Sequence, residues 1–130
     1  MIDGVRRVLE RDDRIAFALL FGSSARGVLR PDSDVDVAVG LRPGTKLNLL
    51  ALGSLAADLG AAAGRRVDLV LLDEAPPAVA YRVFREGRIL VERDRAALVA
   101  RKARAILDYL DFRPVEELCT AGVLRAARGR

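Results

Sequence analysis

The sequence contains no histidine and only one cysteine, Cys119. Without an imidazole, a Ser-His-Asp triad, a histidine-ligated zinc site and a histidine general base are all excluded. A single cysteine excludes an internal disulfide and a thiolate zinc site, and it fits a reducing compartment. Catalysis by this chain must therefore depend on carboxylates, hydroxyl groups, backbone amides, arginine or a hard metal ion.

The chain also lacks a long hydrophobic run. No apolar stretch approaches the roughly 20 residues of a membrane span. The N-terminal stretch MIDGVRRVLERDD has neither an apolar core nor a small-residue cleavage site. We therefore expect no membrane segment, no secretory signal and a cytoplasmic location.

Lysine is scarce, because Lys46 and Lys102 are the only two, and arginine supplies almost all of the positive charge. The net charge is +4, but acidic residues interleave with the arginines throughout. We therefore expect a mixed-charge, solvated surface and no direct nucleic-acid binding.

The hydrophobic pattern predicts an α/β unit, with a small sheet flanked by helices. The continuous apolar run at 15–21 predicts a strand buried on both faces. Further strands are expected at 34–39, 66–72 and 88–91, and helices at 2–12, 45–59, 78–85 and 95–110. The last helix is expected to pack on the sheet through Val99, Ala103, Ile106 and Leu110. The tail from Pro114 onward is expected to be mobile.

Two carboxylates begin the predicted strand at 34–39. Asp34 and Asp36 are two residues apart, so both point to the same face and repel each other unless a cation lies between them. Oxygen ligands without histidine or cysteine select Mg²⁺ or Mn²⁺. Asp68 is a lone charge in the apolar run VDLVLL and joins them if its strand pairs beside theirs. Alternatively, Asp34 is a turn residue and Asp68 pairs with Arg65 or Arg66.

A glycine-serine turn follows the first buried strand. Gly22 lets a phosphate approach the backbone closely, and the start of a helix offers free N–H groups to an anion. Ser23 or Ser24 can cap that short helix. Arg26 either contacts phosphate or pairs with an acidic side chain.

The glycine-serine turn and the paired aspartates are more specific together than either feature is alone. Gly22-Ser23, then ten residues, then Asp34-Val35-Asp36 resembles the signature of the nucleotidyltransferase superfamily typified by DNA polymerase β. GSSARG followed by PDSDVDVAV resembles the minimal nucleotidyltransferase (MNT) family, and the similarity continues through VDLVLLDEAPP and VFREGRILVERD. It implies a polymerase β-like nucleotidyltransferase fold. It also implies a single domain over 1–130, with a catalytic core at about 14–92 and a C-terminal helix and tail at 93–130.

The resemblance also implies roles. The residues implied at the triphosphate of ATP are Gly22, Ser23, Ser24 and Arg26. The implied catalytic residues, which would also be ligands of Mg²⁺ or Mn²⁺, are Asp34, Asp36 and Asp68. Among these, Asp68 would position or deprotonate the attacking hydroxyl.

The implied reaction is transfer of AMP from ATP. Minimal members are similar to antitoxins that modify a tyrosine of a HEPN ribonuclease toxin with AMP, so a hetero-oligomer with such a toxin is implied. Tyr109, Leu110 and Phe112 then form part of the docking surface, or they pack onto the sheet. Two other functions stay open: an antitoxin that acts by binding with little catalysis, and a nucleotidyltransferase for a small-molecule hydroxyl.

Overall fold

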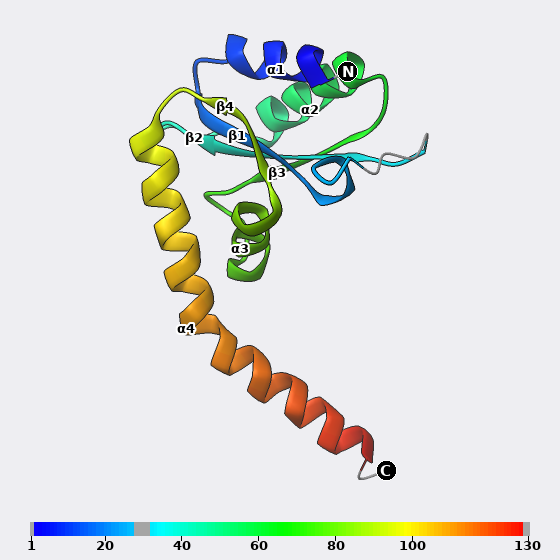
Figure 1. Cartoon of the computed structure of the whole chain (residues 1–130), viewed down its shortest axis with the longest axis vertical. Helices are drawn as coiled ribbons and strands as arrows, with labels where there is room; N and C mark the ends of the chain where they lie inside the picture. Colours follow the sequence, from blue (N-terminus) through cyan, green and yellow to red (C-terminus); the bar gives the residue numbers. More distant parts are fainter. Residues whose placement is uncertain (1, 28–31, 129–130) are drawn as a thin grey trace.

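The computed structural model describes residues 2–27 and 32–128, with side chains described as far as residue 111. Within these residues there are four α-helices, four strands and one 3-10 turn, arranged as Figure 1 shows. In chain order they are α1 (Ile2–Arg11), β1 (Ile15–Phe21), η1 (Gly22–Ser24), β2 (Val35–Leu41), α2 (Leu49–Ala63), β3 (Val67–Leu71), α3 (Pro77–Glu86), β4 (Arg88–Glu92) and α4 (Arg95–Arg128).

The strands form one mixed sheet in the order β3-β2-β1-β4. β1 is antiparallel to both of its neighbours, whereas β2 and β3 are parallel and are joined through α2. Every residue of β1 except Phe21 is buried, as its continuous apolar run predicts. The expected α/β architecture, a small mixed sheet flanked by helices with a C-terminal helix, is confirmed.

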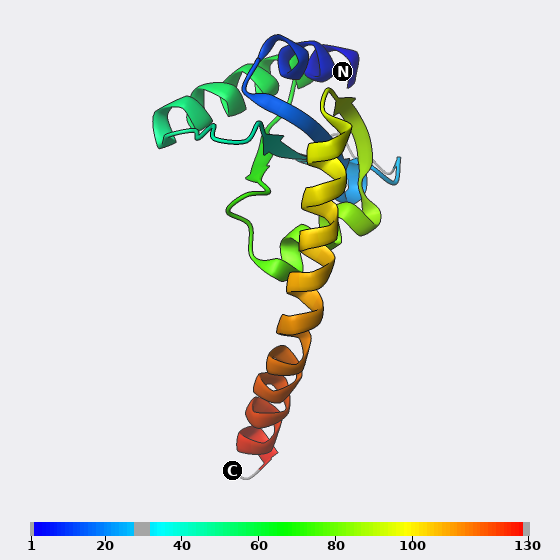
Figure 2. The same ribbon diagram turned by 90° about the vertical axis from the view of Figure 1, so that its left-hand side faces the viewer.

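Helices α1 and α2 cover one face of the sheet, and Figure 2 shows them together above it. Val37 and Val39 of β2 are buried there against Leu9 of α1 and Leu59 of α2. Alternation along a strand sends every second side chain to this face. The residues between the valines must therefore point the other way.

Helices α3 and α4 cover the opposite face. Phe17 of β1 and Ala38 of β2 pack there with Val83 and Phe84 of α3 and with Leu98 of α4. The rings of Phe17 and Phe84 lie 6.2 Å apart between centroids. Asp36 of β2 and Asp68 of β3 project on this side of the sheet.

Helix α2 begins and ends later than the predicted range 45–59. Asn48 caps its start by accepting a hydrogen bond from the N–H of Ala51 at 2.7 Å. Gly64 ends it in the left-handed conformation, with φ of +69°. Gly60 lies inside the helix, which continues to Ala63.

Helix α4 is longer than expected. Asp94 caps its start by accepting a hydrogen bond from the N–H of Ala97 at 3.0 Å. The predicted end near Leu110 and the mobile tail from Pro114 are wrong, since the helix continues to Arg128. Figure 1 shows it leaving the sheet beside α3 and extending well beyond that helix.

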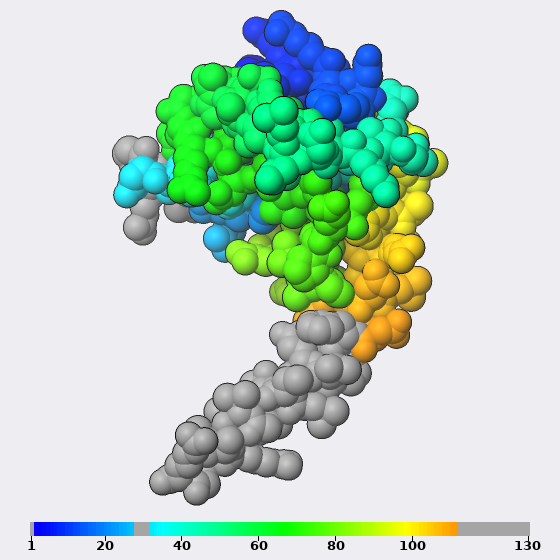
Figure 3. Space-filling view, turned by 180° about the vertical axis from the view of Figure 1, so that it is seen from behind, coloured from blue at the N-terminus to red at the C-terminus, as the bar shows by residue number. Residues whose placement is uncertain are grey.

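The apolar stripe that was expected to pack on the sheet is exposed. Val99, Ile106 and Leu110 are 54%, 37% and 54% exposed, whereas Leu98 and Ala105 are buried. The apolar residues of α4 cover more than one stripe of the helix, so periodicity alone does not select the buried one. Figure 3 shows the flank of α4 beside α3 open to solvent.

None of the helices in the described part of the chain combines the length and the apolar character needed to cross a membrane.

Candidate active site

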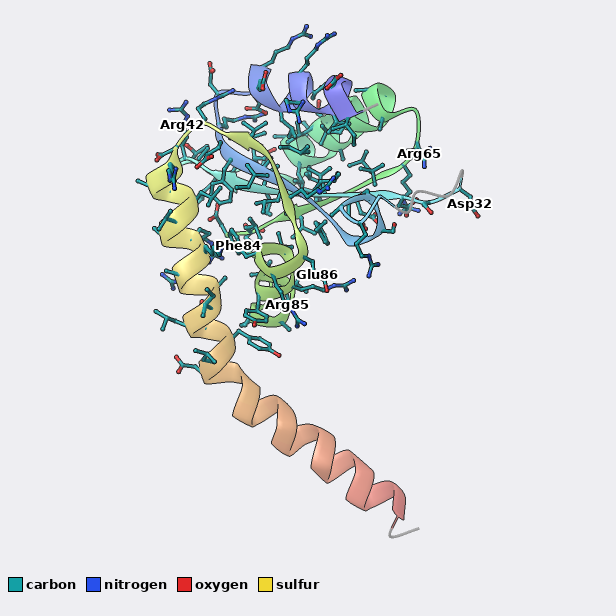
Figure 4. All side chains as sticks on the ribbon, in the orientation of Figure 1. Asp32, Arg42, Arg65, Phe84, Arg85 and Glu86 are labelled. Atoms are coloured by element: carbon teal, nitrogen blue, oxygen red, sulfur yellow. The ribbon has the colours of Figure 1, made fainter. Side chains whose placement is uncertain are left out.

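The candidate site lies at the end of the sheet where β1 stops and β2 starts. Figure 4 labels Asp32 and Arg65 at this end and Arg42 at the opposite one. Phe21, the last residue of β1, pairs with Asp36 of β2. Gly22, which follows Phe21, is therefore next to a carboxylate. Pro31, which precedes this strand, lies outside the described residues.

Two of the predicted carboxylates lie side by side. Asp36 and Asp68 are direct partners in the parallel pairing of β2 with β3. Alternation places Asp36 on the face of Ala38, and Asp68 on that of Val70, and both of these belong to the α3 and α4 side. The strand pairing on which the role of Asp68 depends is thus present.

Asp34 stands just outside the strand. β2 begins at Val35, one residue later than predicted, and the N–H of Val35 donates to the carbonyl of Arg66 at 3.0 Å. Asp34 is half-buried and close enough to Asp36 for their charges to interact. The structure therefore brings Asp36 and Asp68 to one end of one sheet face, with Asp34 just beyond the start of β2.

The electrostatics of the site centre on Asp36. Burial raises the pKa of this carboxyl above its ordinary value, and the charges of Asp68 and then Asp34 raise it further. The guanidinium of Arg82 acts in the opposite direction. A group in this position is ionised at a cost that a bound cation would relieve.

A glycine is required at position 22 both by the backbone conformation and by the neighbouring Asp36 side chain. Its φ is +69°, a left-handed conformation that side chains rarely adopt. A Cβ built there would overlap the Asp36 carboxylate oxygen Oδ2. The absence of a side chain therefore lets the turn close directly over the carboxylate.

The two serines of the turn differ. Ser24 is only 5% exposed, and its hydroxyl donates to the carbonyl of Phe21 at 2.9 Å. The prediction that a serine caps the short helix is wrong, because this hydroxyl holds the turn to the strand end instead. Ser23 is half-buried and keeps one side open. Arg26 is exposed and forms no ion pair with another described residue, so the alternative that it bridges to an acidic side chain is not observed.

Asp68 is more accessible than its apolar surroundings suggest. Its side chain is 49% exposed because β3 is an edge strand, so this lone charge is not enclosed in the core. The Nε of Arg66 lies 3.9 Å from Oδ1 of Asp68, which agrees with the alternative of an ion pair. Arg66 is 79% exposed, so this pair contributes little and leaves Asp68 available.

The donor set fits a hard divalent ion. Its potential ligands are carboxylate oxygens alone, which suit Mg²⁺ or Mn²⁺. Within the described residues, no three acidic, histidine or cysteine side chains already converge on one point. Asp36 and Asp68 are nevertheless neighbours on adjacent strands, and Asp34 is two residues before Asp36.

Sequence reasoning missed Arg82. It lies on α3, and its charge reaches Asp36 although the two residues are far apart in the sequence. The run AYRVFRE predicts an amphipathic helix, but it does not reveal which sheet face that helix covers. Only the packing of α3 identifies this arginine as part of the site.

Comparison with known proteins agrees with this geometry. A family model described as "Polymerase beta, Nucleotidyltransferase" matches residues 4–96. No curated protein is similar enough in sequence to count as a match.

Several solved structures share the fold. A crystal structure of a toxin-antitoxin with AMP-PNP has a TM-score of 0.83 at 23% identity, covering 95% of this chain and 98% of that chain. A complex of tri-AMPylated HEPN toxin with MNT antitoxin from Shewanella oneidensis has a TM-score of 0.77 at 22% identity, covering 95% and 99%. A structure described as a minimal nucleotidyltransferase is 32% identical, with a TM-score of 0.56 and coverage of 67% and 86%.

Proposed function

The chain belongs to the polymerase beta nucleotidyltransferase family, and from this membership we propose that it transfers AMP from ATP to a tyrosine of a HEPN toxin. By this modification it would act as an antitoxin. The proposal includes dependence on Mg²⁺ or Mn²⁺, a hetero-oligomer with the toxin, and one minimal catalytic domain over the whole chain.

The observation that carries the proposal is the arrangement of three residues. Asp36 and Asp68 are partners on adjacent strands, and Gly22 closes against the Asp36 carboxylate without a side chain. Carboxylates held together in this way suit a divalent ion, and a glycine turn beside them suits a phosphate. A nucleoside triphosphate with its metal requires both features at once.

The residues divide the chemistry between them. The backbone at Gly22 and Ser23, with Arg26, would bind the triphosphate, and Asp34, Asp36 and Asp68 would hold the ion. A bound divalent ion would supply charge neutralisation at the phosphates and activation of the attacking hydroxyl.

In the transfer step, the tyrosine oxygen bonds to the α-phosphorus. The bond from that phosphorus to the oxygen bridging to the β-phosphate breaks, and pyrophosphate leaves. The phenolic proton passes to Asp68. The half-exposed position of Asp68 on an edge strand supports this role, because a hydroxyl carried by another protein can reach it.

The acceptor is proposed on two grounds. The similar structures include toxin-antitoxin complexes, one with AMP-PNP and one with a tri-AMPylated HEPN toxin. This chain also exposes apolar side chains on α4, where Leu107 is 62% and Leu110 is 54% exposed. Tyr109 is stacked on Tyr81 of α3 and is half-buried, so we assign docking to its leucine neighbours. The side chain of Phe112 lies outside the described residues.

Mass spectrometry tests the proposal directly. The protein is incubated with ATP, Mg²⁺ and its proposed HEPN partner, and the intact mass of the toxin is recorded. We expect added AMP on a tyrosine with wild-type protein, and none with a double variant, Asp34→Asn with Asp36→Asn. Absence of added AMP with either Mg²⁺ or Mn²⁺ would disprove the enzymatic proposal.

The exposed face of α4 also favours a second candidate function, an antitoxin that neutralises by covering its toxin. The same double variant separates the two functions. If it neutralises toxin in cells as well as wild type does, binding rather than transfer accounts for protection.

A further inference from the structure

The last turn of α3 lies at the end of the sheet that carries the candidate site. Glu86, its final residue, is two positions before Arg88, which pairs with Leu20 of β1. The next residue of β1, Phe21, pairs with Asp36 on its other side. The end of α3 is therefore close to the strand end where the Asp36 carboxylate lies.

Arg82 lies off the side of α3 that contacts α4. Tyr81 stacks on Tyr109 of α4, with ring centroids 4.1 Å apart and planes within 6° of parallel. Successive helical residues are rotated by about 100°, so Arg82 is turned off the α4 side. Figure 4 shows Glu86, one turn later, projecting on the side where the loop bearing Asp32 lies. Arg82 and Glu86 thus share the flank toward the site.

The ion pair that Arg82 forms in this structure is weak. Its Nε lies 3.3 Å from Oε2 of Glu86, and the two side chains are 61% and 32% exposed. A solvent-exposed pair one helical turn apart contributes little to stability. The same guanidinium is close enough to Asp36 for their charges to interact. Arg82 can therefore leave Glu86 at little cost in stability, and its charge is within reach of the site.

We propose that Arg82 is a further nucleotide-binding residue, which exchanges Glu86 for the phosphate oxygens of ATP; this inference rests on the proposed function. A guanidinium presents its donors as a planar fork that matches phosphate oxygens, and it keeps its charge at every physiological pH. Negative charge builds on the β-phosphate as pyrophosphate leaves, and a fixed cation stabilises that charge. Arg82 supplies this cation from α3, an element separate from the Gly22 turn.

Helix α3 offers a matched control. Arg85 is exposed on the same helix, forms no ion pair with another described residue, and lies on the underside away from the sheet in Figure 4. Arg82→Gln and Arg85→Gln remove the same charge from the same helix. A general effect of net charge on ATP binding would appear in both variants, whereas a phosphate contact would appear only in the first.

Titration calorimetry with Mg²⁺ and full-length protein tests the inference. We expect Arg82→Gln to weaken ATP binding about tenfold or more, and Arg85→Gln to change it less than about twofold. Adenosine, which lacks phosphates, should bind wild type and Arg82→Gln equally. Glu86→Gln should bind ATP at least as tightly as wild type, because it removes the competing carboxylate.

The outcomes distinguish this inference from the proposed function. If wild type binds ATP and Arg82→Gln binds it equally well, the inference is overturned while the proposed function stands. If Arg82→Gln loses adenosine binding in the same proportion, its effect is structural and the inference is again overturned. If wild type binds no ATP with Mg²⁺ or Mn²⁺, both fail together.

Discussion

Asp36 and Asp68 face each other across the only parallel strand pair in the described sheet, and both point to the side covered by α3. The charges of Asp68 and Asp34 act on the Asp36 carboxyl, which is already partly removed from water. Such an arrangement opposes folding in the absence of a cation. It therefore links the stability of this domain to its proposed ligand.

The first prediction concerns Asp36→Asn. The raised pKa of Asp36 means that the native state binds a proton more tightly than the unfolded chain does. The free energy of unfolding therefore falls as pH rises from the ordinary carboxyl value through the raised one, and it stays lower at neutral pH. We expect metal-free Asp36→Asn to melt a few degrees above wild type at pH 7, measured by circular dichroism.

The pH dependence supplies the control for that result. Below about pH 3, about one unit under the ordinary aspartate value, the carboxyl is largely protonated in both states, so the difference in Tm should shrink. Asp58→Asn, on an exposed position of α2, should leave Tm unchanged at both pH values. A lower Tm for Asp36→Asn at pH 7 would show that the ionised carboxylate stabilises the fold by itself.

The second prediction concerns Gly22→Ala. The alanine would have to adopt a left-handed backbone conformation, and its methyl group would overlap the Asp36 carboxylate. We therefore expect the free energy of unfolding to fall by about 1–3 kcal/mol and AMP transfer to be lost. Gly44→Ala is the matched control, because Gly44 has φ of +79° but no atom near its built Cβ. Its stability should fall through backbone strain alone, with transfer intact. Equal transfer by both variants would contradict the close approach of Gly22 to Asp36.

Much of this site could be predicted from local pattern. A strand places residues two apart on one face, so the sequence predicts a shared direction for Asp34 and Asp36, although β2 itself begins at Val35. The partnership of Asp36 with Asp68 does not, because it requires β3 to lie beside β2 in parallel, and strand order is a property of the whole sheet. The exposure of Asp68 has the same origin, since the apolar pattern of β3 does not mark it as an edge strand.

The helices show where local pattern fails. Arg82 lies near the site only because of the way α3 packs, and its spacing from Asp36 in the sequence does not predict this. In α4, the apolar stripe through Val99 and Leu110 is exposed, whereas Leu98 and Ala105 are buried. Sequence reasoning therefore gave the composition of that helix and not its orientation.

The third prediction concerns Arg101, which attaches α4 to the sheet. Its Nη2 donates to the carbonyl of Leu72, its Nε lies 3.4 Å from Oδ1 of Asp73, and its side chain is only 17% exposed. We expect Arg101→Ala to cost about 1–3 kcal/mol in urea denaturation. Arg104→Ala is the control, because Arg104 is 75% exposed and should change stability by less than about 0.5 kcal/mol. Similar losses for the two variants would mean that Arg101 is not a specific attachment.

The fourth prediction concerns the exposed apolar face of α4. Leu107 and Leu110 are 62% and 54% exposed, and water contact with two large apolar side chains on one helix is costly unless a partner covers them. Replacing both with aspartate should weaken binding of the HEPN protein at least about tenfold, measured by surface plasmon resonance, because a carboxylate buried in an interface without a partner is strongly unfavourable.

The control for this surface is Leu50→Asp, on α2. Leu50 is 83% exposed, so a carboxylate there adds charge without altering the proposed docking face, and toxin binding should be unchanged. Both the control and the double variant should melt within about 2 °C of wild type, since none of the three side chains belongs to the core. If the double variant binds toxin as wild type does, α4 does not dock the toxin through these leucines. ATP binding should be unaffected in the double variant and in Leu50→Asp, because the leucines and the carboxylates of β2 lie on different elements. That independence separates loss of docking from loss of catalysis.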